Sequence, residues 1–174
     1  MIAFSVCAVF VIFTLLVRPA KVDGGSMQET LHDGDLLIIS DLFYTPQRGD
    51  IVVFEPDPEQ SRYFGNSLIK RVIVTEGEWI DIDFDSWEVK ISTDGESWEL
   101  LDEDYVKYID GVQMRDKSDK YPMQIPEGHI FVMGDNRNGS TDSRSFMLDT
   151  VDTRYVIGRA LFRLFPFDSI GLLK

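Results

Sequence analysis

Short apolar runs between turn residues constrain the fold of this chain more than any other feature of its sequence. The runs span Leu36 to Ile39, Ile51 to Phe54, Leu68 to Val74, Ile130 to Met133 and Tyr155 to Phe165. Turn signals at Asp33-Gly34 and Arg48-Gly49-Asp50 precede the first two runs, and no long segment keeps the apolar period of a helix. We therefore predict a mostly β chain with an antiparallel, barrel-like sheet at its core.

The N-terminal segment Met1 to Val17 contains no charged side chain and is followed by Arg18-Pro19. As a helix it would be about 26 Å long, against a hydrocarbon core of about 30 Å. The sequence predicts one N-terminal transmembrane helix that anchors the chain over residues 1–18. A cleaved signal peptide and a buried core helix are the alternatives, and the absence of a basic n-region disfavours the first.

The chain has 174 residues and a net charge of −13, and its acidic excess is concentrated in residues 76–127. This stretch holds 16 of the 30 acidic residues against five basic ones, and all 3 tryptophans. We predict a folded, β-rich acidic insertion there, forming a small second lobe beside a core made of residues 19–75 and 128–174. A solvated hairpin with no further role is the alternative. The acidity argues against nucleic acid as a partner, because phosphate binding needs clustered cations.

Ser26 follows two glycines just after the N-terminal segment. Glycine permits a compact backbone that exposes the serine hydroxyl and lets an extended substrate approach closely. Backbone N–H groups of such a loop can also face the oxyanion of a tetrahedral intermediate. These features make Ser26 a candidate nucleophile, with an ordinary turn as the alternative.

Lys70 lies inside the apolar run Leu68 to Val74. Strand alternation places it on one face with Leu68, Val72 and Val74. A lysine held among these side chains loses hydration, which lowers its pKa toward the range of a general base. The alternative is an edge-strand lysine whose ammonium group reaches solvent. Together with Ser26, this lysine indicates a serine nucleophile served by a lysine base.

A polar loop, Gly134 to Arg144, directly follows the run that ends at Met133. Within it, Asp142 and Arg144 are spaced to form a charge-assisted pair, and Ser140 can hydrogen-bond to a nearby amine. An Asx-rich turn without a catalytic role is the alternative.

Other chemistries find little support in the sequence. Cys7 is the only cysteine, so no internal disulfide is possible. His32 and His129 both fall in turn-like sequence, which disfavours a Ser-His-Asp triad. Neither metal-ligand spacing nor a phosphate-binding loop is found, and we expect no metal and no cofactor.

Four of these segments, taken in order, resemble the signature boxes of type I signal peptidases, the membrane-bound Ser/Lys proteases that cleave signal peptides from exported proteins. The segments are Ser26 to Leu31, Arg48 to Phe54, Lys70 to Ile73 and Gly134 to Arg144. Two departures stand out: Glu29 replaces the usual proline, and Gly24 replaces a hydroxyl residue that some members use in the oxyanion hole.

The resemblance implies a role for each candidate residue. Ser26 would be the nucleophile and neutral Lys70 the general base that later protonates the leaving amine. Ser140 would orient the lysine amine, while Asp142 and Arg144 would brace the loop behind it.

The resemblance also implies how substrate binds and where the protein works. Met27, Leu31 and Ile69 would line shallow apolar pockets that give an Ala-x-Ala preference, with the substrate added as an extended strand. The partners would be signal peptides of exported preproteins and the lipid bilayer, with the secretion translocon as a further candidate. The protein would cross a bacterial cell membrane once, with its catalytic domain on the extracytoplasmic side. Arg18 and Lys21 alone would place it in the cytoplasm.

Three alternatives stay open at this point. The chain could serve a dedicated substrate such as a pilin rather than general secretion. It could be a catalytically idle membrane scaffold of the same fold, although the intact Ser26 and Lys70 argue against this. A self-cleaving repressor-type Ser/Lys protease is the third, disfavoured by the apolar N-terminus and the lack of a basic DNA-binding domain.

Overall fold

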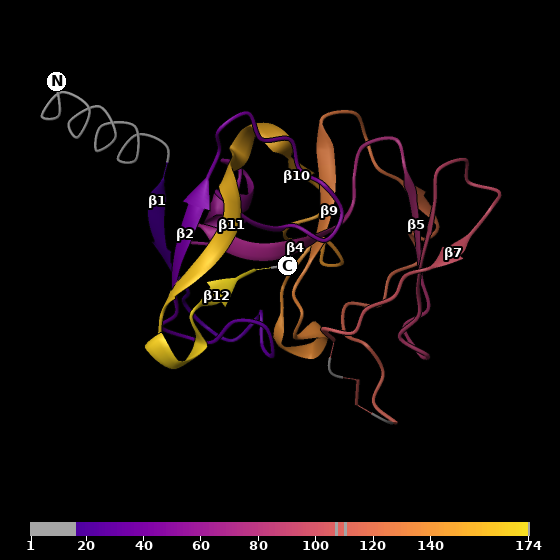
Figure 1. The fold of residues 1–174 in the computed structure, drawn as a ribbon. Helices are drawn as coiled ribbons and strands as arrows, with labels where there is room; N and C mark the ends of the chain where they lie inside the picture. Colours follow the sequence, from indigo (N-terminus) through magenta and orange to yellow (C-terminus); the bar gives the residue numbers. More distant parts are fainter. Residues whose placement is uncertain (1–16, 107, 110, 174) are drawn as a thin grey trace, which may run out of the picture.

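The larger of two antiparallel sheets forms the body of the protein (Figure 1). The computed structural model describes residues 17–106, 108–109 and 111–173. In the eight-stranded sheet the strands follow the order β1-β2-β11-β3-β4-β9-β10, and β12 pairs with β11. Their bounds are β1 Arg18–Lys21, β2 Leu36–Ser40, β3 Ile51–Phe54, β4 Leu68–Val74, β9 His129–Met133, β10 Val151–Asp152, β11 Val156–Phe165 and β12 Gly171–Leu172.

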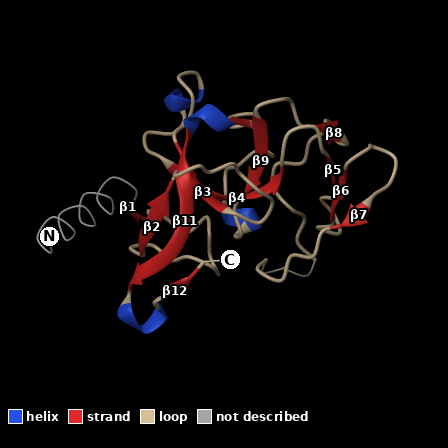
Figure 2. Cartoon of the chain, turned by 45° about the horizontal axis from the view of Figure 1, so that its top comes forward, coloured by secondary structure: helices blue, strands red, loops and turns tan. Residues whose placement is uncertain are grey.

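The second sheet has four strands in the order β7-β6-β5-β8 and lies beside β9, away from β1 and β2 (Figure 1). Its strands are β5 Trp79–Ile82, β6 Val89–Ser92, β7 Glu99–Leu100 and β8 Met123–Gln124. All four fall within the acidic segment 76–127, where a β-rich insertion was expected; its standing as a separate lobe remains a prediction. The described helices are short 3-10 turns in the connections (Figure 2): η1 Gln60–Arg62, η2 Arg137–Gly139, η3 Thr153–Tyr155 and η4 Phe167–Ser169.

The mostly β prediction is confirmed. Each of the five apolar runs forms a strand whose ends differ from the prediction by a residue at most. Gly34 and Gly49, in the two turns named from the sequence, both have φ of +89°, a backbone conformation that a side chain would strain.

One detail of the predicted strand over Leu68 to Val74 differs. Strict alternation along β4 groups Val74 with Lys70 and Val72, but the pairing of β4 with β9 shifts register between Val72 and Val74. Because of this irregularity, Val74 packs in the same apolar cluster as Ile73, whereas Val72 packs in another cluster. Val74 therefore does not share a face with Val72. A bulge adds one residue to a strand and so reverses the faces beyond it.

The predicted anchor over residues 1–18 lies outside the described residues except for its last two. The sequence predicts Arg18 as the last residue of the anchor, whereas the structure shows it as the first residue of strand β1. Across residues 17–106, 108–109 and 111–173, no helix has the length and apolar character needed to cross a bilayer.

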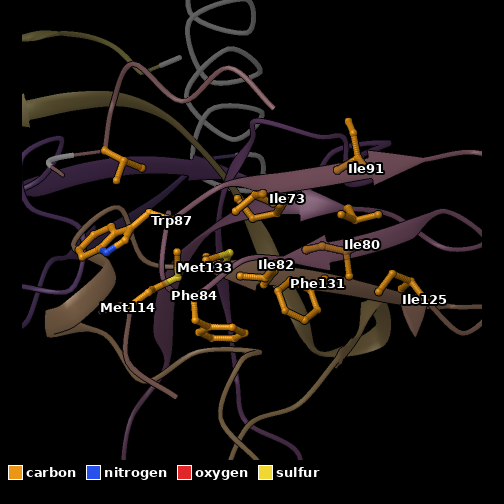
Figure 3. Packing of buried hydrophobic residues seen from close by; sticks show 13 residues of the cluster. Ile73, Ile80, Ile82, Phe84, Trp87, Ile91, Met114, Ile125, Phe131 and Met133 are labelled. Atoms are coloured by element: carbon orange, nitrogen blue, oxygen red, sulfur yellow. The ribbon is translucent and has the colours of Figure 1, made fainter. Parts of the chain in front are cut away.

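Strand β9 separates two of the apolar clusters. Its side chains alternate, so that Ile130 and Val132 pack with β3 and β10, whereas Phe131 and Met133 face the acidic segment. Figure 3 shows Phe131 and Met133 among residues from both sheets, including Ile80. A single cluster of buried side chains therefore joins the two sheets.

Replacing Phe131 with alanine is expected to lower the free energy of unfolding by about 3–5 kcal/mol, because its ring is 0% exposed and fills this shared cluster. Phe43→Ala is the control, since that ring is 97% exposed. Urea unfolding of both variants measures the difference. Equal losses at the two positions would contradict the packing described here.

Candidate functional site

Ser26 lies in the turn between β1 and β2, and this turn is held in place by the loop after β9. The backbone N–H of Asn136 donates to the carbonyl oxygen of Ser26 over 3.0 Å. The side-chain Nδ2 of the same asparagine donates to the carbonyl oxygen of Gly25, also over 3.0 Å. One residue of the Gly134 to Arg144 loop therefore fixes the peptide groups on both sides of Ser26.

Lys70 is brought to Ser26 by its place in the middle of β4, where it pairs with Val52 of β3. The side chain is only 3% exposed. Its Nζ donates to Ser26 Oγ over 2.8 Å and to the carbonyl oxygen of Ile69 over 3.1 Å. The two residues are 44 positions apart, so the contact depends on the tertiary fold.

Burial lowers the pKa of Lys70 from its ordinary 10.5 to about 8. The carboxylates of Asp142 and Asp135 act in the opposite direction, and Arg144 lowers the pKa further. A substantial fraction of Lys70 is therefore neutral at mildly alkaline pH, in the form that can accept a proton.

Asp142 and Arg144 form the buried pair that the sequence predicts. Arg144 donates from Nε and Nη2 to the two carboxylate oxygens of Asp142, each over 2.8 Å. Gly134 N–H adds a 2.9 Å bond to the same carboxylate. Burial alone would raise the pKa of Asp142, but Arg144 beside it holds the pKa below its usual range. This pair fixes the end of the loop to its beginning.

Ser140 lies in the same loop, and its hydroxyl is buried. It lies close enough to Asp142 to help lower the pKa of that carboxyl, but it makes no hydrogen bond of normal geometry to a described residue. The bond to the Lys70 amine that the resemblance implies is thus not formed in this structure. Gly134 packs directly against it: a Cβ added there would overlap both Ser140 Oγ and the Ser26 carbonyl oxygen. The lack of a side chain at Gly134 lets the two loops meet.

A second buried pair lies beside the site and was not singled out from the sequence. Arg71, next to Lys70, donates to both carboxylate oxygens of Asp135, over 2.9 and 2.8 Å. Asp135 also accepts from Thr30 Oγ1, and Arg71 donates to the carbonyl oxygen of Gly49. Asp135, Asn136 and Arg71 fall inside the segments that carried the resemblance, and that was the only signal for them.

Of the residues predicted to line substrate pockets, Met27 and Leu31 are buried in one apolar cluster, and Ile69 packs against it partly exposed. The structure therefore places all three together near Ser26. Their contact with substrate stays a prediction.

The histidines have ordinary structural contacts. The backbone N–H of His32 donates to Asp35, and the His129 ring contacts the carbonyl oxygen of Glu127 at 2.9 Å. Among the residues that the structure describes, no group of three or more His, Cys, Asp or Glu side chains is arranged to hold a metal ion.

The sequence of the chain matches a known protein family. A model of the family described as signal peptidase, peptidase S26, matches residues 1–165 of the chain. The chain belongs to this signal peptidase family. The resemblance inferred from the four sequence segments is confirmed.

Several members of the family are similar to nearly the whole chain. A probable signal peptidase I-1 of Synechocystis sp. is 34% identical over 95% of this chain and 82% of its own length. Signal peptidase I of Bacillus licheniformis is 34% identical over 97% of this chain and 88% of its own. A probable chloroplastic thylakoidal processing peptidase 2 of Arabidopsis thaliana is 33% identical over 97% of this chain, which spans only 44% of that longer protein.

A solved structure of a signal peptidase I from Enterococcus faecalis is 28% identical, with a TM-score of 0.49. The match covers 67% of this chain and 97% of that one.

Gly134→Ala is expected to reduce the free energy of unfolding by about 1–3 kcal/mol, because the added methyl group collides with the Ser26 backbone. Gly65→Ala is the matched control: nothing lies within 4 Å of a Cβ there, and its φ is not positive. Chemical unfolding compares the two. A loss at position 65 as large as that at position 134 would show that the contact is not the cause.

The lowered pKa of Lys70 should also appear in stability. Between about pH 8 and 10.5 the unfolded chain holds a proton on Lys70 that the folded chain has lost, so this residue makes stability rise with pH in that window. Below about pH 8 Lys70 is protonated in both the folded and the unfolded chain. The free-energy cost of burying its ammonium group then lowers the stability by its full amount.

The stability of wild type relative to Lys70→Met should therefore increase by about 2–3 kcal/mol between pH 7 and pH 10. Urea unfolding of both proteins at several pH values measures this difference, and the comparison cancels the titration of shared groups. A difference that does not change with pH would mean that Lys70 keeps an ordinary pKa.

Proposed function

We propose that this chain removes signal peptides from exported preproteins by acyl transfer through Ser26, with Lys70 as general base. The observation that supports this most directly is the 2.8 Å contact between Lys70 Nζ and Ser26 Oγ, made by an amine that is almost fully buried. Nucleophile and base must lie within hydrogen-bond reach, and the pKa of the base must lie near working pH. Both conditions hold for this pair.

In the proposed mechanism, neutral Lys70 accepts the hydroxyl proton as Ser26 Oγ attacks the scissile carbonyl carbon. The carbonyl oxygen becomes an oxyanion, and backbone N–H groups of the Ser26 turn would stabilise it. The lysine ammonium then gives its proton to the leaving amine as the C–N bond breaks. Neutral Lys70 then takes a proton from a water molecule, whose oxygen attacks the acyl carbon. As the ester C–O bond breaks, Lys70 returns the proton to Ser26 Oγ, and the cleaved signal peptide leaves as a carboxylic acid.

The residues around the pair would keep the lysine in place through this cycle. Asp142 and Arg144 fix the loop that carries Ser140, whose buried hydroxyl lies beside Gly134. We propose that Ser140 bonds the Lys70 amine during the reaction and orients its lone pair toward Ser26. Such support restricts the base to the productive geometry.

The substrate class follows from the family. We propose an Ala-x-Ala preference, with Met27, Leu31 and Ile69 forming shallow apolar pockets along an extended peptide. The N-terminal segment 1–18 would anchor the chain in the membrane, with residues 19–75 and 128–174 as catalytic core on the extracytoplasmic side. The exported preprotein, the bilayer and the secretion translocon would be its partners.

The test is cleavage of an exported precursor with an Ala-x-Ala site by the detergent-solubilised full chain across pH. We expect kcat/KM to rise through a midpoint near pH 8, because the free enzyme becomes active as Lys70 loses its proton. Ser26→Ala and Lys70→Ala should each reduce kcat by about 1,000-fold or more. Lys90→Ala is the control, since that lysine is half-exposed on strand β6 and its ammonium group pairs with the exposed Glu88 across 3.3 Å.

Full activity of a folded Lys70→Ala would refute the lysine mechanism. A folded wild type that cleaves no exported precursor would favour the idle scaffold. Cleavage confined to one precursor, such as a pilin, would indicate a dedicated enzyme.

A further inference from the structure

The acidic segment 76–127 makes direct polar contacts with the loop that carries Ser140, Asp142 and Arg144. Three side chains of the segment reach this loop at successive points along it. The pairs are Glu103 with Arg137, Arg115 with the carbonyl oxygen of Asn138, and Lys120 with the carbonyl oxygen of Ser143. The segment therefore contacts the loop on both sides of Ser140.

The first of these contacts is a buried ion pair. Glu103 is 4% exposed and Arg137 1% exposed. The guanidinium group donates to both carboxylate oxygens, from Nη1 to Oε2 over 2.9 Å and from Nη2 to Oε1. A buried charge of this kind is strongly destabilised when its partner is removed. Glu103 is thus the counter-ion that allows Arg137 to be buried in the loop.

Arg137 connects this ion pair to the Asp142–Arg144 pair. Its carbonyl oxygen accepts a 2.6 Å bond from Arg144 Nη2, the same nitrogen that bonds Asp142. A shift of the Arg137 backbone would therefore disturb a hydrogen bond of Arg144. Because Arg144 also bonds Asp142, the shift would reach the part of the loop that carries Ser140.

Tyr105, two residues after Glu103, reaches the other side of the site. Its ring lies under the guanidinium of Arg71, with Arg71 Cζ 4.0 Å from the ring centroid. Its hydroxyl donates to Glu103 Oε1 over 3.0 Å. Arg71 follows Lys70 in β4 and pairs with Asp135. Glu103 and Tyr105 together link the 134–144 loop to the strand that carries the proposed base.

We propose that Glu103 is a positioning residue for the Ser26–Lys70 pair, acting with Tyr105 to hold Arg137 and Arg71 and so to fix the polar surroundings of the lysine. This inference rests on the proposed function and assigns to the acidic segment a part in it. Glu103 touches neither Ser26 nor Lys70 and would act only through the residues between them.

The charges around Lys70 set the direction of the expected effect. Asp142 and Asp135 raise its pKa, and Arg144 lowers it. Without the Glu103 charge, Arg137 becomes a buried cation without its ion-pair partner, and its positive charge still interacts with Asp142. The loss of one negative charge lowers the pKa of Lys70. The pull of Arg137 on the Asp142 carboxylate weakens the effect by which Asp142 raises that pKa, so both changes favour neutral Lys70.

The test is Glu103→Gln in the detergent-solubilised full chain, with Glu99→Gln as the matched control from exposed strand β7. We expect kcat for precursor cleavage to fall about 10- to 100-fold and KM to change little. The rising limb of the kcat/KM profile, which follows the loss of the Lys70 proton, should move to lower pH by about half a unit or more. Circular dichroism gives the folded fraction to which rates are normalised.

The double variant Glu103→Gln, Arg137→Gln removes both charges and is expected to return the limb toward its wild-type position. It also keeps the test available if Glu103→Gln alone does not fold. Titration of the Lys70 ¹³Cε resonance by NMR should show the same shifts without substrate, so this inference is tested even if the chain cleaves no precursor.

Glu103→Gln with wild-type kcat per folded molecule and an unmoved Lys70 titration would overturn the inference. The same holds if only thermal stability falls, because a purely structural role would leave the pH profile in place. Failure of the wild type to cleave any precursor would instead refute the proposed function.

Discussion

The burial of the Lys70 amine is the constraint on which the rest of the site depends. An amine in the protein interior loses hydration, and it stays there only if a partner receives its N–H and the neighbouring charges are fixed. Ser26 Oγ and the Ile69 carbonyl oxygen supply the partners. Asp142 and Asp135 supply nearby negative charge, and each is itself held by an arginine. The site is a set of buried ion pairs arranged around one neutralisable lysine.

Much of the fold could be predicted from the sequence because it depends on local properties. Apolar runs between turn residues gave the strands of the larger sheet, and the positive φ of Gly34 and Gly49 fits the turns expected there. The bulge at Val72–Val74 could not be predicted, because it arises from pairing with β9. Strand β1 was missed because Pro19 and its charged neighbours lack an apolar pattern.

The candidate site shows a similar division. Ser26, Lys70, Asp142 and Arg144 stood out by their residue types in unusual surroundings, and the structure brings each pair together. Glu103 did not stand out, because it is one of 16 acidic residues in its segment and nothing in the neighbouring sequence distinguishes it. Its burial depends on Arg137, 34 positions later, and such a pairing exists only in the folded chain.

The apolar cluster shared by the two sheets has a consequence for how this chain can diverge in evolution. Phe131 and Met133 complete their packing against side chains of the acidic segment, Ile80 and Met114 among them (Figure 3). Deleting the segment would expose the back of β9, the strand that leads into the Gly134 loop. The outward-facing acidic residues of the segment can be substituted at little cost in stability. Its inward-facing apolar residues can change only together with their packing partners in β4 and β9.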